Sequence, residues 1–292
     1  MIIDGQKISR EICKNIQKKI SAFQGRPPCL AVIMAGDNPA SALYVRRKVA
    51  ACQEVGITSL KKIFPSQVTE EELIGAVDLF NANHAVDGIL VQLPLPEHIN
   101  TTKVITAIDP EKDVDGFHPQ NVGKLMMGAT DGFVSCTPLG ISILLQRTGA
   151  DLKGKHAVIL GRSNVVGKPL AALLMQRSRG YDLTVTIVNR HLQDIATICR
   201  QGDIVISAVG IPHIIESNMV KEGAIVIDVG INRIPDPNRP TKHLIVGDVD
   251  FEQVKEKTSM ITPVPGGVGP MTIAMLLHNT VLSYEWRLGL SL

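Results

Sequence analysis

The sequence predicts an α/β protein with two domains, each built on strands that alternate with helices. Short apolar runs that end in glycine alternate with helical patterns in both halves of the chain. Such alternation is typical of parallel βαβ units. The 292 residues suffice for two domains or one large one, and an apolar share of 45% suffices for a full core. In such a sheet we expect a ligand at the carboxyl ends of the strands.

The first half begins with a helix pattern, a strand pattern and a second helix pattern. Isoleucines at every fourth position predict the first helix: Ile8, Ile12, Ile16 and Ile20. The apolar run at 29–36 predicts a buried strand. Asn38 before Pro39 predicts the start of the next helix, because asparagine caps a helix well and proline suits its first turn. This helix is expected to reach about Glu54 and to end near Gly56.

Further elements follow the same alternation. Thr69 and Glu72 have the spacing of a capping box, which predicts another helix. The remaining apolar runs predict strands at 87–93, 155–161, 183–189, 203–210 and 224–232. A helix is expected around Gly167 and a last helix from about Met271. We place the boundary between the two halves near Thr137–Pro138.

Composition and charge exclude several classes of protein. The net charge is only +2, from 30 basic and 28 acidic residues, and aromatic residues make up 3%. Nucleic-acid binding is therefore not expected, because it needs a concentrated basic face or an aromatic platform. The first residues, MIIDGQKISREI, do not have the pattern of a signal peptide, and no apolar run approaches the roughly twenty residues of a membrane span. We expect a soluble cytoplasmic protein with no membrane partner.

The five cysteines agree with a reducing compartment. They are odd in number and contain no CxxC pair, which favours free thiols over disulfides or a zinc site. They are Cys13, Cys29, Cys52, Cys136 and Cys199.

The segment ITPVPGGVGPMT, residues 261–272, combines three glycines with three prolines. Glycine lets the backbone approach a ligand closely, and proline stiffens the segment and removes hydrogen-bond donors. A flat ligand could therefore lie against the main chain here. The alternative is a rigid turn before the C-terminal helix.

The segment SALYVRRKVAACQEVG brings Ser41, Tyr44 and Lys48 onto one helix face, with apolar residues on an adjacent face. A lysine in a partly dry pocket can have its pKa lowered and can then act as a general base. The alternative is a solvated lysine beside Arg46 and Arg47. These arginines could also attract an anionic substrate tail.

Two polar segments follow buried strands in the first half. Gln92 ends an apolar strand, where its amide either faces a ligand or bonds to local backbone. The loop DPEKDVDGFHP carries three carboxylates: Asp109, Asp113 and Asp115. A calcium loop would need a glutamate at position 120, which is glutamine. We expect no metal and assign one carboxylate a role as a hydrogen-bond acceptor.

The turn GRSNVVGKP follows a strand and opens a helix, as a dinucleotide-binding turn does, although it is not GxGxxG. Arg162 and Ser163 could supply donors to a phosphate. Arg190, followed by His191, comes after the next strand, where an acidic residue would suit a free ribose hydroxyl and an arginine suits the 2′-phosphate of NADP. The alternative is an exposed arginine on a loop.

Five segments, in this order, resemble the tetrahydrofolate dehydrogenase/cyclohydrolase family over nearly the whole chain. They are YVRRK, DGILVQLPLP, DVDGFHP, GRSNVVGKP and PVPGGVGPMT. The resemblance implies a bifunctional enzyme of one-carbon metabolism. Such an enzyme oxidises 5,10-methylenetetrahydrofolate with NADP and hydrolyses the methenyl product to 10-formyltetrahydrofolate.

The resemblance also implies roles for individual residues. Lys48 would assist the attack of water, Gln92 would bond to Lys48, and Tyr44 would orient the folate. Asp115 would accept hydrogen bonds from the pterin, and Gly269 and Pro270 would contact the folate. The implied cofactor-binding residues are Gly161, Arg162, Ser163, Arg190, Ile231 and Thr272.

The implied architecture has two α/β domains with a cleft between them. Residues 1–137 plus 272–292 would form the folate-binding catalytic domain. Residues 138–271 would form the Rossmann-like NADP-binding domain, through which two copies would pair as a homodimer. No metal is implied for either step.

Three alternatives remain at this stage. One is a monofunctional NAD-dependent dehydrogenase of the same family, against which Lys48 and Arg190 argue. Another is a Rossmann dehydrogenase for a different small substrate, such as shikimate or an amino acid. The third is a non-catalytic folate- or nucleotide-binding protein. The chain departs from many relatives in having VNRH at 188–191 and in a longer loop, QRSRGYDL.

Overall fold

The computed structural model describes residues 1–236 and 239–290 and divides the chain into two compact units. Arg10–Cys136 and Ile273–Leu292 form one, here called the three-strand unit. Met1–Ser9 and Thr137–Thr272 form the other, here called the five-strand unit. The expected ranges 138–271 and 272–292 include residues 237–238 and 291–292, which lie outside the described residues.

The three-strand unit contains a parallel sheet in the order β2-β1-β3. Its elements in chain order are α1 (Gly5–Ser21, with its first residues in the other unit), β1 (Cys29–Ala35), α2 (Pro39–Val55), β2 (Thr58–Phe64), α3 (Glu70–Ala82), β3 (Gly88–Val91), α4 (Thr101–Ala107), α5 (Pro119–Met126) and most of α10 (Val268–Leu288). Every residue of the central strand β1 is buried. A continuous apolar run is what a parallel strand covered on both faces requires.

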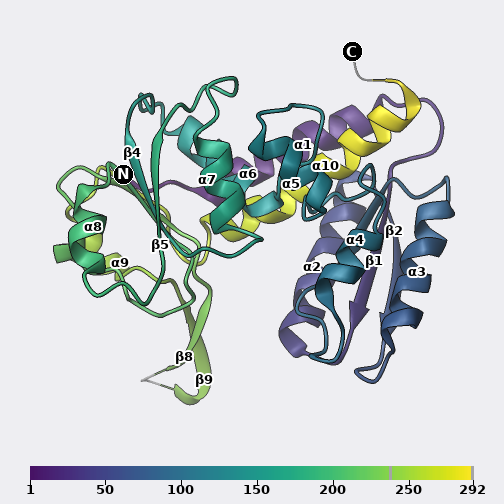
Figure 1. Cartoon of the computed structure of the whole chain (residues 1–292), viewed down its shortest axis with the longest axis horizontal. Coiled ribbons are helices and arrows are strands. Elements are labelled where there is room, and N and C mark those ends of the chain that lie inside the picture. Colours follow the sequence, from purple (N-terminus) through teal and green to yellow (C-terminus); the bar gives the residue numbers. More distant parts are fainter. Residues whose placement is uncertain (237–238, 291–292) are drawn as a thin grey trace. The chain divides into compact units, whose positions relative to one another are not determined.

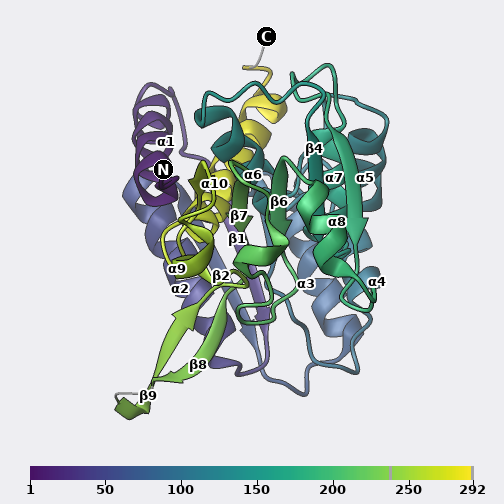
Figure 2. The same ribbon diagram turned by 90° about the vertical axis from the view of Figure 1, so that its left-hand side faces the viewer.

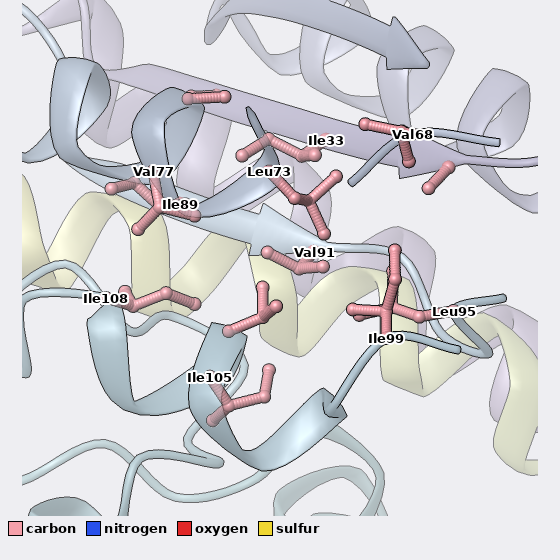
Figure 3. Close-up of a cluster of buried hydrophobic side chains, with 14 of the residues drawn as sticks. Ile33, Val68, Leu73, Val77, Ile89, Val91, Leu95, Ile99, Ile105 and Ile108 are labelled. Atoms are coloured by element: carbon pink, nitrogen blue, oxygen red, sulfur yellow. The ribbon is translucent and has the colours of Figure 1, made fainter. Parts of the chain in front are cut away.

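One core cluster of this unit lies between the sheet and two helices (Figure 3). Ile33 of β1 and Ile89 of β3 pack with Leu73 and Val77 of α3 and with Ile105 of α4. All five side chains are at most 7% exposed. The core therefore fixes the sheet, and with it the strand ends that carry Gln92 and the aspartate loop.

The five-strand unit has a parallel sheet in the order β10-β7-β6-β4-β5. Its elements are α6 (Cys136–Arg147), β4 (His156–Leu160), α7 (Gly167–Leu174), β5 (Thr184–Val188), α8 (Ile195–Gln201), β6 (Ile204–Ser207), the 3-10 helix η1 (Ser217–Met219), β7 (Ile225–Asp228), β8 (Asn232–Asp236), β9 (Arg239–Val246), α9 (Phe251–Val254) and β10 (Met260–Ile261). The antiparallel ribbon of β8 and β9 projects from this sheet (Figures 1 and 2).

The local predictions of helix starts are confirmed. Asn38 Oδ1 accepts hydrogen bonds from Ala40 N and Ser41 N, and Gly56 ends α2 in the left-handed conformation. Thr69 and Glu72 form the reciprocal capping box. The last helix, however, begins at Val268 rather than near Met271.

The division of the chain falls between Cys136 and Thr137 and between Thr272 and Ile273. Residues 1–9, expected in the folate-binding domain, instead lie in the five-strand unit. There Ile3 N donates to Ile261 O over 2.8 Å, and Ile2 forms a parallel bridge with Ile261. Among the described residues, no helix combines the length and apolar character that crossing a membrane requires.

Candidate active site

Lys48 lies in the middle of the buried face of α2. That face consists of Ser41, Val45, Lys48, Cys52 and Val55, at spacings of three and four residues. Lys48 is only 9% exposed, so an ammonium occupies a position where helix periodicity would place an apolar residue. Sequence analysis put Val45 and Cys52 on an adjacent face; in the structure they share the face of Lys48. The alternative of a solvated lysine is therefore wrong.

Gln92 is the hydrogen-bond partner of Lys48. Lys48 Nζ donates to Gln92 Oε1 over 3.1 Å, across 44 residues of sequence. Gln92 Nε2 donates to the carbonyl of Leu93 over 2.7 Å, and its backbone N donates to Ile33 O over 2.8 Å. The bond to Leu93 O agrees with the interpretation of local backbone bonding, whereas a ligand contact of Gln92 stays a prediction. The local backbone bond fixes the amide so that its oxygen faces the lysine.

Two of the three carboxylates in the aspartate loop accept hydrogen bonds from the loop and from the helix after it. Asp113 accepts from Phe117 N (3.2 Å), His118 N (2.8 Å) and Asn121 Nδ2 (2.9 Å), and burial raises its pKa to about 7. Asp109 accepts from the backbone N of Glu111. These two side chains therefore shape the loop itself.

Asp115 is the third carboxylate of this loop. The segment before it runs beside β3, since Ile89 N donates to Lys112 O and Ile89 bridges with Asp113. Asp115 therefore follows a strand-like segment at the same sheet edge as Gln92. Asp115 is half-buried. Its burial raises the pKa of the carboxyl, while the charge of Lys48 and the hydrogen bond from Cys136 oppose this rise.

Sequence reasoning did not identify two buried residues that support Asp115. Cys136 Sγ lies 3.7 Å from Asp115 Oδ1 and 3.4 Å from Val114 O. Asn279 Nδ2 donates to Val114 O over 2.8 Å and to Val134 O over 3.1 Å. A lone asparagine inside the apolar helix pattern of α10 was the available indication, because a buried amide needs partners. Burial and the Asp115 carboxyl raise the pKa of the Cys136 thiol well above its ordinary value, which favours a neutral donor.

The other predicted residues of α2 are more exposed. Tyr44 is half-buried, one turn before Lys48, and Arg46 and Arg47 are exposed. Arg46 and Arg47 therefore point away from the buried face that carries Lys48, and their contact with an anionic substrate tail stays a prediction.

In the segment 261–272, two of the three glycines are required by the fold itself. Gly266 has φ +113, which favours glycine, and a Cβ on Gly267 would lie 2.7 Å from Pro263 O. Gly269 differs, because the nearest atom to its Cβ position is Ile231 Cδ1 at 3.9 Å. The turn interpretation thus holds for Gly266 and Gly267, while Gly269 keeps an open side beside Ile231. The following Pro270 is half-buried.

The turn after β4 is closely packed by its two glycines. A Cβ on Gly161 would lie 2.4 Å from Ala208 O, and one on Gly167 would lie 2.0 Å from Gly161 O. Ser163 Oγ accepts from Val166 N over 3.1 Å, so its hydroxyl proton stays available to a ligand. A tight glycine turn that leads into a helix presents backbone N–H groups and suits an anion.

Arg162 and Arg190 lie at adjacent strand ends. Arg162 follows β4 and Arg190 follows β5, and these strands are parallel neighbours. Gly161 N donates to Val188 O over 2.9 Å, which joins the two strand ends. Both arginines are exposed. Two accessible guanidinium groups at one sheet edge are a suitable arrangement for a phosphate.

Thr272 has a partner within the five-strand unit. Its hydroxyl lies 2.9 Å from Thr137 Oγ1, and it contacts Val268 O at 3.4 Å. The remaining predicted cofactor residue, Ile231, is 48% exposed. An aliphatic side chain with half of its surface exposed offers an apolar contact to a ligand.

A cavity of about 300 Å³ occurs elsewhere in the three-strand unit, with Asn121, Lys124, Trp286 and Arg287 in its lining. Its polar groups bond to protein: Lys124 pairs with Asp131, and Arg287 pairs with Asp87. None of the predicted site residues lines it. Within the described ranges, no group of three or more His, Cys, Asp or Glu residues is arranged to hold a metal ion.

Family models match both parts of the chain. Residues 3–115 match the tetrahydrofolate dehydrogenase/cyclohydrolase catalytic domain, and residues 135–288 match the NAD(P)-binding domain of the same family. The bifunctional protein FolD of Protochlamydia amoebophila (strain UWE25) is 56% identical over 292 residues, with 100% of both chains covered.

Solved structures agree with these matches. The bifunctional enzyme FolD of Campylobacter jejuni is 48% identical with a TM-score of 0.92, covering 98% of this chain and 99% of that chain. The methylenetetrahydrofolate dehydrogenase-cyclohydrolase of Trypanosoma brucei, solved with NADP and an inhibitor, is 38% identical with a TM-score of 0.93. The match covers 99% of this chain and 98% of that chain. With two family models and full-length relatives in agreement, the chain belongs to the tetrahydrofolate dehydrogenase/cyclohydrolase family.

Proposed function

We propose that this protein oxidises 5,10-methylenetetrahydrofolate to the 5,10-methenyl form with NADP and then hydrolyses the product to 10-formyltetrahydrofolate. Family membership over both halves of the chain supports this pair of reactions. The observation that carries the proposal is the buried Lys48 bonded to Gln92 Oε1.

In the hydrolysis step, Lys48 assists the attack of water on the methenyl carbon. An amine is useful there because it can accept or return a proton at the reacting centre. Gln92 positions it, since the bond to Leu93 O fixes the amide and leaves Oε1 directed at Nζ. Tyr44, one turn away, orients the folate beside the lysine.

Folate recognition is assigned to Asp115, with Gly269 and Pro270 as further contacts. The Asp115 carboxyl accepts a hydrogen bond from the Cys136 thiol, which is a weak donor. The carboxylate thus keeps acceptor capacity for the two adjacent donors of a pterin edge. Gly269 leaves room for a ring to approach the main chain.

NADP binding is assigned to the edge of the five-strand sheet. Gly161 and Ser163 provide the close turn, Arg162 and Arg190 take the 2′-phosphate, and Ile231 and Thr272 contact the rest of the cofactor. The glycine cradle and the two exposed arginines fit a phosphorylated dinucleotide. Bound NADP supplies the hydride acceptor; the protein supplies position and charge.

We further propose that the three-strand unit is the folate-binding domain and the five-strand unit the NADP-binding domain. Two copies would pair through the latter in the cytoplasm. The exposed apolar residues Leu244 (37%) and Ile245 (40%) of the β8–β9 ribbon support the pairing. The five free cysteines support the cytoplasmic location. Sedimentation tests the pairing, because a species of 31.6 kDa at micromolar concentration would contradict it.

The test of the reaction is the appearance of methenyltetrahydrofolate absorbance, after acid quench, with methylenetetrahydrofolate and either NADP or NAD. Turnover that favours NADP supports the oxidation and the phosphate contacts of Arg162 and Arg190. Turnover that favours NAD keeps the reaction and overturns the cofactor assignment. Folded protein without product with either cofactor overturns the proposed function.

A further inference from the structure

Two buried carboxylates in the five-strand unit have no part in the chemistry assigned above. Asp228 ends β7 and is 3% exposed, and Asp248 follows β9 and is 0% exposed. Neither pairs with a lysine or arginine among the described residues. Buried carboxylates without a cationic partner need other donors, and these donors show what the pair does.

Asp248 joins the loop after β6 to the segment after β7. Its Oδ2 accepts from Ser207 Oγ (3.1 Å), Val209 N (2.9 Å) and Gly210 N (3.1 Å). Its Oδ1 accepts from Asn232 Nδ2 over 2.9 Å. One side chain thereby fixes two loops at the carboxyl edge of the sheet, where ligands of such folds bind.

Asp228 holds the other side of the same segment. It accepts from Gly230 N, Asp248 N and Val249 N, each over 2.9 Å. The packing leaves no room for a side chain at Gly230, whose Cβ would lie 2.1 Å from Asp248 Oδ1. At Gly247 a Cβ would lie 1.8 Å from Asp228 Oδ2. The carboxylates and the two glycines therefore form one interlocked structure.

Ile231 lies between the two residues that this structure holds. Gly230 before it is bonded to Asp228, and Asn232 after it is bonded to Asp248. Ile231 itself is 48% exposed, and a Cβ added at Gly269 would lie 3.9 Å from its Cδ1. Two fixed neighbours around an exposed aliphatic side chain restrict where that side chain can point.

We propose that Asp228 and Asp248 are positioning residues for the cofactor: they hold the loops after β6 and β7 so that Ile231 is presented as a fixed apolar contact for NADP. This inference rests on the proposed function. A loop held before binding loses less conformational entropy on binding, so loosening it weakens the affinity.

The test compares two variants with a matched control. Asn232→Ala removes the bond to Asp248 Oδ1 and leaves the other bonds of Asp248 in place. Asp248→Asn alters the acceptor itself. Asp194→Asn is the control, because Asp194 also accepts a hydrogen bond from a backbone amide, Thr197 N, but caps α8, which precedes β6 in the chain.

Three quantities are measured on each folded protein: the dissociation constant of NADP by calorimetry, hydrogen exchange of residues 207–232 without cofactor, and hydrolysis of methenyltetrahydrofolate. We expect about a tenfold weaker affinity for NADP and faster exchange in both variants. Hydrolysis should stay within about twofold of the wild type. This readout excludes a general loss of folding, which would lower every measured quantity together. The control should match the wild type in all three.

Unchanged NADP affinity in folded Asn232→Ala and Asp248→Asn overturns the inference. A parallel loss of NADP binding and hydrolysis also overturns it, because it assigns the carboxylates to general stability. Should Asp248→Asn fail to fold, Asn232→Ala decides alone. Wild-type protein that binds no NADP would instead overturn the proposed function, so the two failures are distinct.

Discussion

Lys48 Nζ donates a hydrogen bond of 3.1 Å to Gln92 Oε1 from a helix position that faces the core. The amide cannot rotate freely to another partner, because Gln92 Nε2 is bonded to Leu93 O. The pair thus joins the middle of α2 to the end of β3. Each prediction below changes one group of the site or of its supporting structure.

Lys48→Met should abolish hydrolysis of methenyltetrahydrofolate, with a fall of at least about a hundredfold. Methionine keeps the length and the apolar stem of lysine, so the buried face of α2 should still pack. Binding of NADP should stay near normal. Stopped-flow loss of the methenyl absorbance measures the rate, with Lys14→Met on the exposed side of α1 as the control. Wild-type hydrolysis by Lys48→Met would remove the lysine from the mechanism.

Asp115→Asn should raise the KM for methylenetetrahydrofolate by about tenfold to a hundredfold, because the amide replaces an acceptor of charge-assisted bonds. Burial raises the pKa of Asp115. In the proposed complex the ionised form binds the pterin. The wild-type KM should therefore increase as pH falls, starting at a higher pH than for an ordinary aspartate. The variant should lack this pH dependence. A pH profile of KM that is identical in both proteins would contradict the assignment.

Arg190→Ala should weaken NADP by about tenfold to a hundredfold and leave the use of NAD unchanged. In the proposed complex this guanidinium binds the 2′-phosphate, which distinguishes the two cofactors. The ratio of kcat/KM for NADP and NAD is the measurement. Arg177→Ala is the control, since its exposed side chain pairs with Asp182 in the longer loop. A ratio unmoved by Arg190→Ala would return Arg190 to the alternative of a loop arginine.

Gly269→Ala should separate ligand binding from folding. The added methyl meets only ordinary contact, at 3.9 Å from Ile231, and alanine stabilises a helix by roughly 0.5–1 kcal/mol relative to glycine. The Tm should therefore hold or rise, while the KM for the folate should increase several-fold. Gly266→Ala provides the contrast: at φ +113 it should lower the Tm. Unaltered folate kinetics in Gly269→Ala would leave Gly269 with a structural role only.

Lys112→Met should destabilise the protein by about 2–4 kcal/mol. Lys112 is 2% exposed, and its Nζ donates to Phe80 O, Asn81 O and Asn83 O at the end of α3. Methionine would leave three carbonyls without this donor. Denaturant unfolding measures the loss. Lys103→Met, which breaks an exposed pair with Glu70, should change the midpoint little; equal effects of the two substitutions would contradict the explanation.

The sequence by itself predicted many elements of this protein and named the candidate residues, but it did not predict β2, α4, α5 or the ribbon of β8 and β9. Asn38 with Pro39, and Thr69 with Glu72, predicted helix starts correctly, because a cap bonds only to residues within one turn of it. Buried parallel strands were also recognisable, since a strand covered on both faces needs an unbroken apolar run. The motifs around Lys48, Gly161 and Gly269 pointed to the family through their resemblance to its known motifs.

Only the tertiary structure decided which groups meet. Helix periodicity could not place Lys48 on the buried face, because its acceptor lies 44 residues away on another element. The carboxylates of Asp113 and Asp115 are alike in sequence, yet backbone donors of the folded loop bond to Asp113, whereas Asp115 accepts from the Cys136 thiol. Asp228, Asp248 and Asn279 gained their roles from partners on distant segments. Such hydrogen bonds and such burial depend on which distant segments the fold brings together. The spacing of residues along the sequence does not specify this.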